Sequence, residues 1–324
     1  MRLLGLFLDP ATRRVRSGWR AAFALALSPP FVALLVPAGG EAAEPRSFDA
    51  SAGLLIGYGL LIGWMALVSW VGLRFLEGLP FRSLGYGFHR GWWKDVWKGV
   101  GVGVLMIVAV VLLQMAGGGT RVTVNPIALE SPGRVLGQVG GALGLFILAG
   151  AFEEIVYRGY AFQTLLRGTS AGVPILFFSI FFGLMHWNNP SRTFFSTANT
   201  VLAGIWLSIA YLKTRNLWFP TALHFAWNWA QGALFGIPVS GLLVPRQPLL
   251  LSSTGAPLWL TGGSYGSEGG AATTLVLALA TILIWRANWL TASAEPAASP
   301  DDDAPVRLNL AEGEEEEEKR NTWK

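Results

Sequence analysis

Two adjacent glutamates lie inside a long apolar stretch of the sequence, and an arginine follows one helical turn later. These residues are Glu153, Glu154 and Arg158. A carboxylate in the hydrocarbon of a bilayer is energetically costly, so an ionisable residue in such a segment is a candidate functional residue. Two of the three histidines, His186 and His224, also lie in apolar segments. We therefore treat these five residues as a candidate site.

The spacing of these residues suggests their chemistry. Glu154 and Arg158 are four residues apart, so a helix would place them on one face, where the arginine could hold a glutamate ionised. The other glutamate, in a medium of low dielectric constant, could accept or donate a proton near neutral pH. His224 and Asn228 are also four residues apart and would share a helix face.

Each of these residues also has a purely structural explanation. A Glu–Arg pair in a membrane helix can be a structural ion pair, and a lone membrane histidine is often a hydrogen-bonded packing residue. Asn228 can join two helices through its amide. The functional interpretation therefore depends on the whole set and not on any one member.

The composition indicates a polytopic helical membrane protein. The chain is 52% hydrophobic and 14% charged, with a mean hydropathy of +0.45, whereas a soluble domain has roughly 25% charged residues. The absence of cysteine excludes disulfides, thiolate metal ligands and a thiol nucleophile. The sequence pI of about 9.6 does not indicate nucleic-acid binding, because membrane orientation explains the basic residues better.

About eight apolar segments are long enough, at roughly 20 residues each, to cross a bilayer. They run approximately over residues 19–38, 52–74, 98–116, 137–166, 171–188, 194–212, 217–236 and 271–288. We therefore expect an all-α fold, a polytopic bundle of transmembrane helices. Basic residues concentrate at the N-terminus and in alternate loops, so the positive-inside rule places both termini in the cytoplasm.

Three further segments have their own signatures. Residues 81–98 mix Trp with Lys and Arg, which predicts an amphipathic helix in the cytoplasmic interface, with an ordinary aromatic belt as the alternative. His89 lies there, and we interpret it as interfacial. The first apolar segment could instead be a cleaved signal peptide, with a weak cleavage context at Ala42-Ala43. The tail beyond about residue 292 is acidic and predicted to be disordered.

The candidate residues can lie at one depth in the bilayer. Glu154 and His186 are each about sixteen residues from a basic turn near residue 170, or roughly 24 Å along a helix. Asn228 is about twelve residues, or roughly 18 Å, beyond the turn at Asn216. His224 would lie one turn lower. A tilt of these helices can absorb the difference in depth. We therefore predict that one cavity brings together Glu153, Glu154, His186, His224 and Asn228.

Three motifs in chain order resemble those of the CAAX-protease and bacteriocin-processing family (CPBP or Abi), a family of intramembrane endopeptidases. The motifs are Glu153-Glu154-x-x-x-Arg158, Phe182-x-x-x-His186 and His224-x-x-x-Asn228. The glycine-rich segment 260–270, which contains Glu268, also resembles a segment of bacterial members. The resemblance covers about residues 82–288. It implies an integral protein of a bacterial inner membrane that acts on a membrane-associated peptide or protein.

The resemblance implies hydrolysis of a peptide bond by an activated water. We expect Glu154 to be the general base and His186 to help hold the water. Glu153 and Arg158 would set the charge around the base. The two glutamates point about 100° apart on a helix, so their roles could be reversed. His224 would help to polarise the scissile carbonyl.

A metal ion remains an open alternative under this resemblance. Glu154, His186 and His224 could supply zinc ligands, although the helical His-Glu-x-x-His signature is absent. Asn228 suits an oxyanion-binding role and is a poor zinc ligand, which favours the metal-free alternative. The sequence therefore predicts either no cofactor or zinc.

The resemblance also suggests a division of the chain. Residues 1–80 would form an N-terminal cytoplasmic segment with two spans, residues 81–290 the protease core, and residues 291–324 the acidic tail. Partners would be the lipid bilayer and a membrane-associated substrate, with no nucleic acid. Two other functions fit the same fold: a catalytically silent scaffold and a proton-coupled transporter. The complete motifs disfavour the scaffold, and the lack of internal repeats disfavours the transporter.

Overall fold

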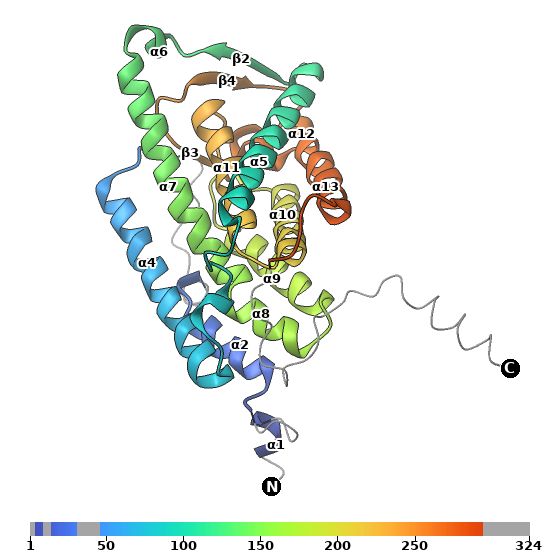
Figure 1. Ribbon diagram of the computed structural model, residues 1–324. Helices are drawn as coiled ribbons and strands as arrows, with labels where there is room; N and C mark the ends of the chain where they lie inside the picture. Colours follow the sequence, from blue (N-terminus) through green and yellow to red (C-terminus); the bar gives the residue numbers. More distant parts are fainter. Residues whose placement is uncertain (1–3, 9–13, 31–45, 294–324) are drawn as a thin grey trace, which may run out of the picture.

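The computed structural model describes residues 4–8, 14–30 and 46–293, and these residues form a bundle of helices with short strands at one end (Figure 1). The first half of the bundle contains α1 (Leu4–Phe7), α2 (Ser17–Ala26), α4 (Ala52–Val71), α5 (Trp92–Ala116), α6 (Pro126–Glu130) and α7 (Pro132–Arg158). The second half contains α8 (Tyr160–Gly168), α9 (Gly172–Met185), α10 (Phe194–Thr214), α11 (Trp218–Trp229), α12 (Leu258–Thr261) and α13 (Ala271–Arg286). A π-helical turn extends α4 over Gly72–Glu77, and another extends α11 over Ala230–Leu234.

Four helical stretches are long and apolar enough to cross a bilayer. They are Ala52–Glu77, Trp92–Ala116, Pro132–Gly168 and Phe194–Thr214. The shorter helices α9 and α13 are also apolar. These findings confirm a helical integral membrane protein, whereas the number of eight spans stays a prediction. Part of the first expected span, the expected cleavage context and the acidic tail fall on residues 31–45 and 294–324, outside the described residues.

The described residues are mostly helical, as expected, and they also contain two short pairs of strands. The strand β2 (Thr120–Val124) pairs antiparallel with β4 (Leu250–Thr254). A second, shorter pair joins β1 (Arg46–Ser47) in parallel to β3 (Leu242–Leu243). The β-branched residues of β2 favour an extended strand, and its partner lies in the long loop after α11. This loop therefore folds back over the end of the bundle.

The expected interfacial helix over residues 81–98 is not one helix in the structure. A 3-10 turn covers Phe81–Leu84, and α5 begins only at Trp92. Between them, Gly85 and Gly91 adopt left-handed backbone conformations with φ of 105° and 99°, which interrupt a right-handed helix. The imidazole of His89 contacts the carboxylate of Asp95 at 3.2 Å.

The helix α7 lies between α4 on one side and α11 on the other (Figure 1). On its far side, α11 packs very closely against α5. A Cβ atom on Gly103 of α5 would come within 2.6 Å of the carbonyl oxygen of Leu223 on α11. Glycine at this position permits the close approach. The fold thus holds α11, which carries His224 and Asn228, firmly against two long helices.

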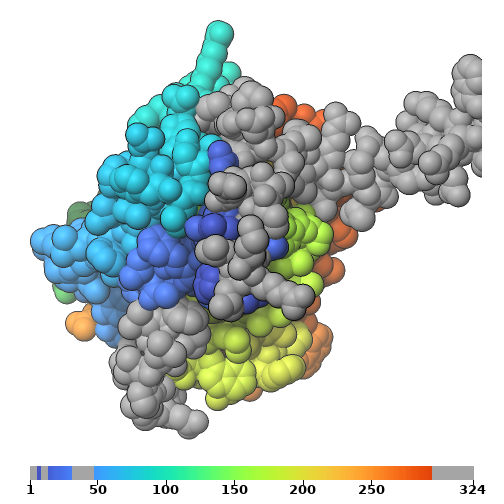
Figure 2. Space-filling view, turned by 90° about the horizontal axis from the view of Figure 1, so that it is seen from below, coloured from blue at the N-terminus to red at the C-terminus, as the bar shows by residue number. Residues whose placement is uncertain are grey.

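At the other end of the bundle, α2 packs against α8 (Figure 2). Glu77 is buried there and pairs with Arg20 at 3.0 Å and also with Arg167. These ion pairs connect α2 to the π-helical turn after α4 and to α8. They lie outside the cavity that contains the candidate residues.

Candidate active site

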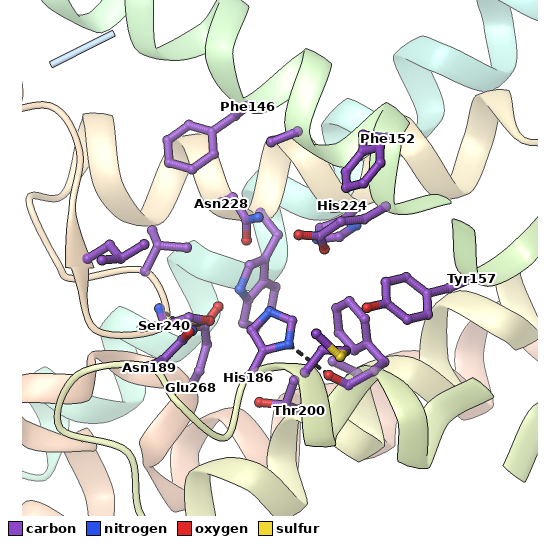
Figure 3. A pocket seen from close by; sticks show the side chains of 18 of the residues that line it. Phe146, Phe152, Tyr157, His186, Asn189, Thr200, His224, Asn228, Ser240 and Glu268 are labelled. Carbon is purple, nitrogen blue, oxygen red and sulfur yellow. Dashed lines mark hydrogen bonds and ion pairs between the residues drawn. The ribbon is translucent and has the colours of Figure 1, made fainter. Parts of the chain in front are cut away.

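A cavity of about 490 Å³ lies between the helices, and it brings together residues from all three motifs. Glu153 near the end of α7 lines it. His186 just after α9, and His224 and Asn228 on α11, line it as well (Figure 3). Much of the remaining wall is aromatic or aliphatic. Its volume is typical of a ligand pocket.

Glu153 and Glu154 have different surroundings because successive helix residues point about 100° apart. Glu153 lines the cavity, and 26% of its side chain is exposed. The side chain of Glu154 is fully buried and does not line the cavity. The structure thus separates a cavity-facing carboxylate from an enclosed one.

Glu154 is paired with Arg158, as the spacing predicts. Its Oε1 accepts a hydrogen bond of 3.0 Å from a terminal nitrogen of Arg158. The other terminal nitrogen of Arg158 donates to the carbonyl of Gly204 on α10 at 2.9 Å. The guanidinium lies 5.2 Å from the ring centroid of Phe182. Arg158 therefore links α7 to α9 and α10 and neutralises the enclosed carboxylate.

His224 lies between the two carboxylates. Its Nδ1 is 2.9 Å from Oε1 of Glu154, while its Nε2 is 3.6 Å from Oε2 of Glu153. Oε1 of Glu154 also accepts from Arg158, so it serves as an acceptor toward the imidazole as well, and Nδ1 of His224 donates this hydrogen bond. Glu154 thereby fixes the orientation of the imidazole and leaves Nε2 toward Glu153.

His186 is oriented by the backbone of its own motif. Its Nδ1 donates to the carbonyl of Phe182 at 2.7 Å, which leaves Nε2 as the acceptor of the neutral ring. The ring of Phe182 lies 4.7 Å from that of His186 and 6.0 Å from that of His224, measured between centroids. Phe182 therefore packs against both imidazoles and sets their separation.

Asn228 lies one turn after His224 on α11, and the start of this helix is fixed by Asn216. The side-chain oxygen of Asn216 accepts hydrogen bonds from the backbone nitrogens of Trp218 and Phe219 at 3.0 and 3.3 Å. Its amide nitrogen donates to Asp95 at 3.0 Å. Such capping satisfies donors at the helix N-terminus that have no other partner.

Sequence reasoning missed polar residues on the opposite side of the cavity. Glu268, Ser240 and Asn189 line it together with the motif residues (Figure 3). Glu268 lies in the glycine-rich segment 260–270, which resembles a segment of bacterial members of the family. Nothing in the sequence placed this segment at the site. The loop after α11 contains β4, and only the pairing of β4 with β2 shows that this loop lies over the cavity.

The expected zinc ligands do not form a ligand set. Among residues 4–8, 14–30 and 46–293, no group of three His, Cys, Asp or Glu side chains is arranged to hold a metal ion. Glu154 already accepts from Arg158 and His224 and does not line the cavity, so it is not placed as a ligand. By contrast, Nε2 of His186 and Nε2 of His224 make no hydrogen bond with the described residues that would prevent ligation. A catalytic zinc site needs about three protein ligands and an open position. As arranged, the candidate side chains Glu154, His186 and His224 do not form a complete zinc ligand set.

A comparison with protein families finds a match to the type II CAAX prenyl endopeptidase Rce1-like family over residues 136–230. The matched segment contains all three motifs, from Glu153 to Asn228. Neither a comparison with curated proteins nor one with solved structures gives a match. The resemblance derived from the motifs is confirmed over residues 136–230, where the chain is similar to the CAAX-protease family.

Proposed function

We propose that the protein is an intramembrane endopeptidase that hydrolyses a peptide bond of a membrane-associated peptide or protein with a water molecule activated by Glu153. The observation that carries this proposal is the joint presence of Glu153, His186, His224 and Asn228 on one cavity between apolar helices. The Rce1-like match supports the same class of reaction.

Glu153 is the better general base, which exchanges the roles expected for the two glutamates. A general base must reach the proton that it removes. Glu153 lines the cavity, whereas Glu154 is enclosed and paired with Arg158. Glu153 would accept a proton from the water, and Nε2 of His186 would accept the second hydrogen bond of that water. The oxygen of the water would then attack the scissile carbonyl carbon.

Asn228 and His224 would stabilise the negative charge that develops on the carbonyl oxygen. The side-chain amide of Asn228 is a neutral donor that faces the cavity, and preorganised donors of this kind lower the barrier of acyl-transfer reactions. Collapse of the tetrahedral intermediate breaks the C–N bond. The proton held by Glu153 then passes to the leaving amine nitrogen, which returns Glu153 to its ionised form.

Cleavage of internally quenched peptides tests the proposal. The panel contains acylated membrane-proximal peptides and a prenylated CAAX peptide, and the full-length protein is reconstituted in lipid nanodiscs. Wild type is expected to cleave at least one peptide, and Glu153→Gln should lower kcat by about 10²-fold or more. The control Glu130→Gln changes an exposed carboxylate far from the motifs in the sequence. Full activity of Glu153→Gln would contradict the assignment of the base.

The same assay examines the role of a metal. The mechanism proposed here predicts that cleavage continues after treatment with a chelator, because no step requires a metal ligand. Loss of activity with chelator and its return with zinc would contradict this mechanism. Absence of cleavage across the panel, with a protein that unfolds cooperatively on heating, would favour the scaffold alternative.

A further inference from the structure

A second carboxylate faces the cavity from the segment between α12 and α13. Glu268 lies in a 3-10 turn, Ser267–Gly269, between α12 and α13. Its side chain lines the cavity with His186 and Asn228, and Figure 3 shows it close to Ser240 and Asn189. The hydrolysis proposed above does not use this carboxylate.

The side chain of Glu268 is held in a fixed position. Its Oε2 accepts hydrogen bonds from both the backbone nitrogen and the hydroxyl group of Ser240, the latter at 2.9 Å. Ser240 has a φ of 49°, which is uncommon for a residue other than glycine. Asn189, three residues after His186, donates to the carbonyl of Ser240 at 3.0 Å. Strained backbone that is held in this way often marks a functional position.

The backbone around Glu268 is anchored to a long helix. The side-chain amide nitrogen of Asn199 on α10 donates to the backbone carbonyls of Glu268 and Gly270 at 2.9 and 3.1 Å. The hydroxyl of Thr274 donates to the side-chain oxygen of Asn199 at 2.7 Å. The carboxylate therefore belongs to the rigid wall of the cavity and not to a freely moving loop.

The cavity has an acidic character without a fixed cation. Its carboxylates and imidazoles are those of Glu153, Glu268, His186 and His224, and no lysine or arginine is among the described lining residues. Burial raises the pKa of Glu268, because its ionised form loses water; the hydrogen bonds from Ser240 offset part of this effect, and the two histidines offset a further part. A buried carboxylate without a cationic partner is unfavourable, and an entering cation would supply that partner.

The aromatic wall would favour the same kind of group. Phe146, Trp206 and Trp227 line the cavity with Glu268. A lysine ammonium or arginine guanidinium is attracted to the face of an aromatic ring, and its alkyl stem is apolar. The combination of a fixed carboxylate and aromatic surface therefore suits a long cationic side chain better than an acidic or a short polar one.

We propose that Glu268 is a specificity-determining residue that binds a lysine or arginine side chain of the substrate close to the scissile peptide bond. This inference rests on the proposed endopeptidase function and deepens it by naming the substrate class. The peptide would enter with its cationic side chain toward Glu268 and its scissile carbonyl toward Asn228 and His224.

A cleavage assay with an acylated peptide library tests the inference, with cleavage sites read by mass spectrometry. We expect wild type to prefer Lys or Arg over Gln at one position beside the cleaved bond by about tenfold or more. In Glu268→Gln the ratio should fall to about one, whereas Glu268→Asp and the control Glu130→Gln should retain a preference. An unchanged ratio in Glu268→Gln, or an equal loss for all peptides, would overturn the inference.

A binding measurement separates this inference from the proposed function. A palmitoylated pentapeptide with one lysine and its glutamine counterpart are titrated into the full-length protein in nanodiscs, with wild type and with Glu268→Gln. Tighter binding of the lysine peptide to wild type, lost in the variant, supports a cation site even if no peptide is cleaved. Equal binding of both peptides to wild type overturns the inference. This comparison uses the wild-type protein alone, so its result does not depend on whether the variant folds.

Discussion

Nδ1 of His224 lies 2.9 Å from Oε1 of Glu154, the glutamate that is closed off from the cavity. The adjacent Glu153 approaches the other nitrogen of the same ring at 3.6 Å. One imidazole therefore connects an enclosed, arginine-paired carboxylate to a cavity-facing one. In this arrangement Glu154 is a positioning residue, while Glu153 is free to react.

The two glutamates should respond differently to neutral substitution. Glu154→Gln leaves Arg158 buried without a charged partner, and breaking a buried pair in this way costs about 3–5 kcal/mol. Glu153→Gln removes a partly exposed carboxylate and should change stability much less. Thermal unfolding of both variants in the same lipid is the measurement. Equal melting temperatures for the two variants would contradict the separation of their roles.

The sequence could predict most of the helices and the identity of the motif residues. The expected segment 194–212 corresponds to α10 (Phe194–Thr214), and the expected segment 271–288 to α13 (Ala271–Arg286). These helices can be predicted because each apolar stretch is long enough to cross a bilayer and is bounded by charged turns. The fourth expected segment is divided at Gly159, directly after Arg158, into α7 and α8.

The role of each glutamate and the presence of Glu268 could not be read from the sequence. Helical spacing shows that Glu153 and Glu154 face different directions, but it does not show which direction leads to the cavity. That depends on how α7 is rotated against α11. Glu268 reaches the cavity only because the loop after α11 pairs with β2 and is held by Asn199. Such long-range contacts have no local pattern in the sequence.

The close packing of α5 on α11 predicts that two glycine substitutions on α5 differ in their effect on stability and activity. In Gly103→Ala the new Cβ would meet the carbonyl oxygen of Leu223 at 2.6 Å, so α11 must shift. We expect a loss of about 1–3 kcal/mol in stability and a fall in kcat, because His224 and Asn228 move with α11. Gly101→Ala on the same helix meets nothing within 4 Å and should be neutral or slightly stabilising. Similar melting temperatures and activities for both variants would contradict this packing.

Phe182 offers a test of how the two histidines are positioned. Phe182→Leu keeps the backbone carbonyl that accepts from His186, but it removes the ring that packs against both imidazoles. Misplacement of catalytic groups lowers kcat strongly, so we expect a fall of about tenfold or more with little change in KM. Steady-state kinetics on one cleaved peptide provide the measurement. A change confined to KM would assign Phe182 to substrate binding instead.

Glu268 should make the stability of the protein depend on pH in a defined direction. Burial raises the pKa of this carboxyl above its usual value of 4.5, so the folded state holds the proton more tightly than the unfolded state. Its contribution to stability is therefore largest at pH below 4.5 and is lost as the pH rises through the folded-state pKa. The hydrogen bonds from Ser240 oppose this shift, and so do His186 and His224, which face the same cavity.

The variant Glu268→Gln lacks this titration. Its melting temperature relative to wild type should therefore rise as the pH is raised from about 4 to 8, whatever the constant effect of the lost hydrogen bonds to Ser240. Both proteins are unfolded thermally in the same nanodiscs at each pH, and Glu130→Gln serves as the control for an exposed carboxylate. If the difference between variant and wild type were constant across this range, or became smaller as the pH rose, the carboxylate would not be destabilised by its burial. The lack of a lysine or arginine among the described residues of the cavity wall would then no longer argue for a cationic substrate.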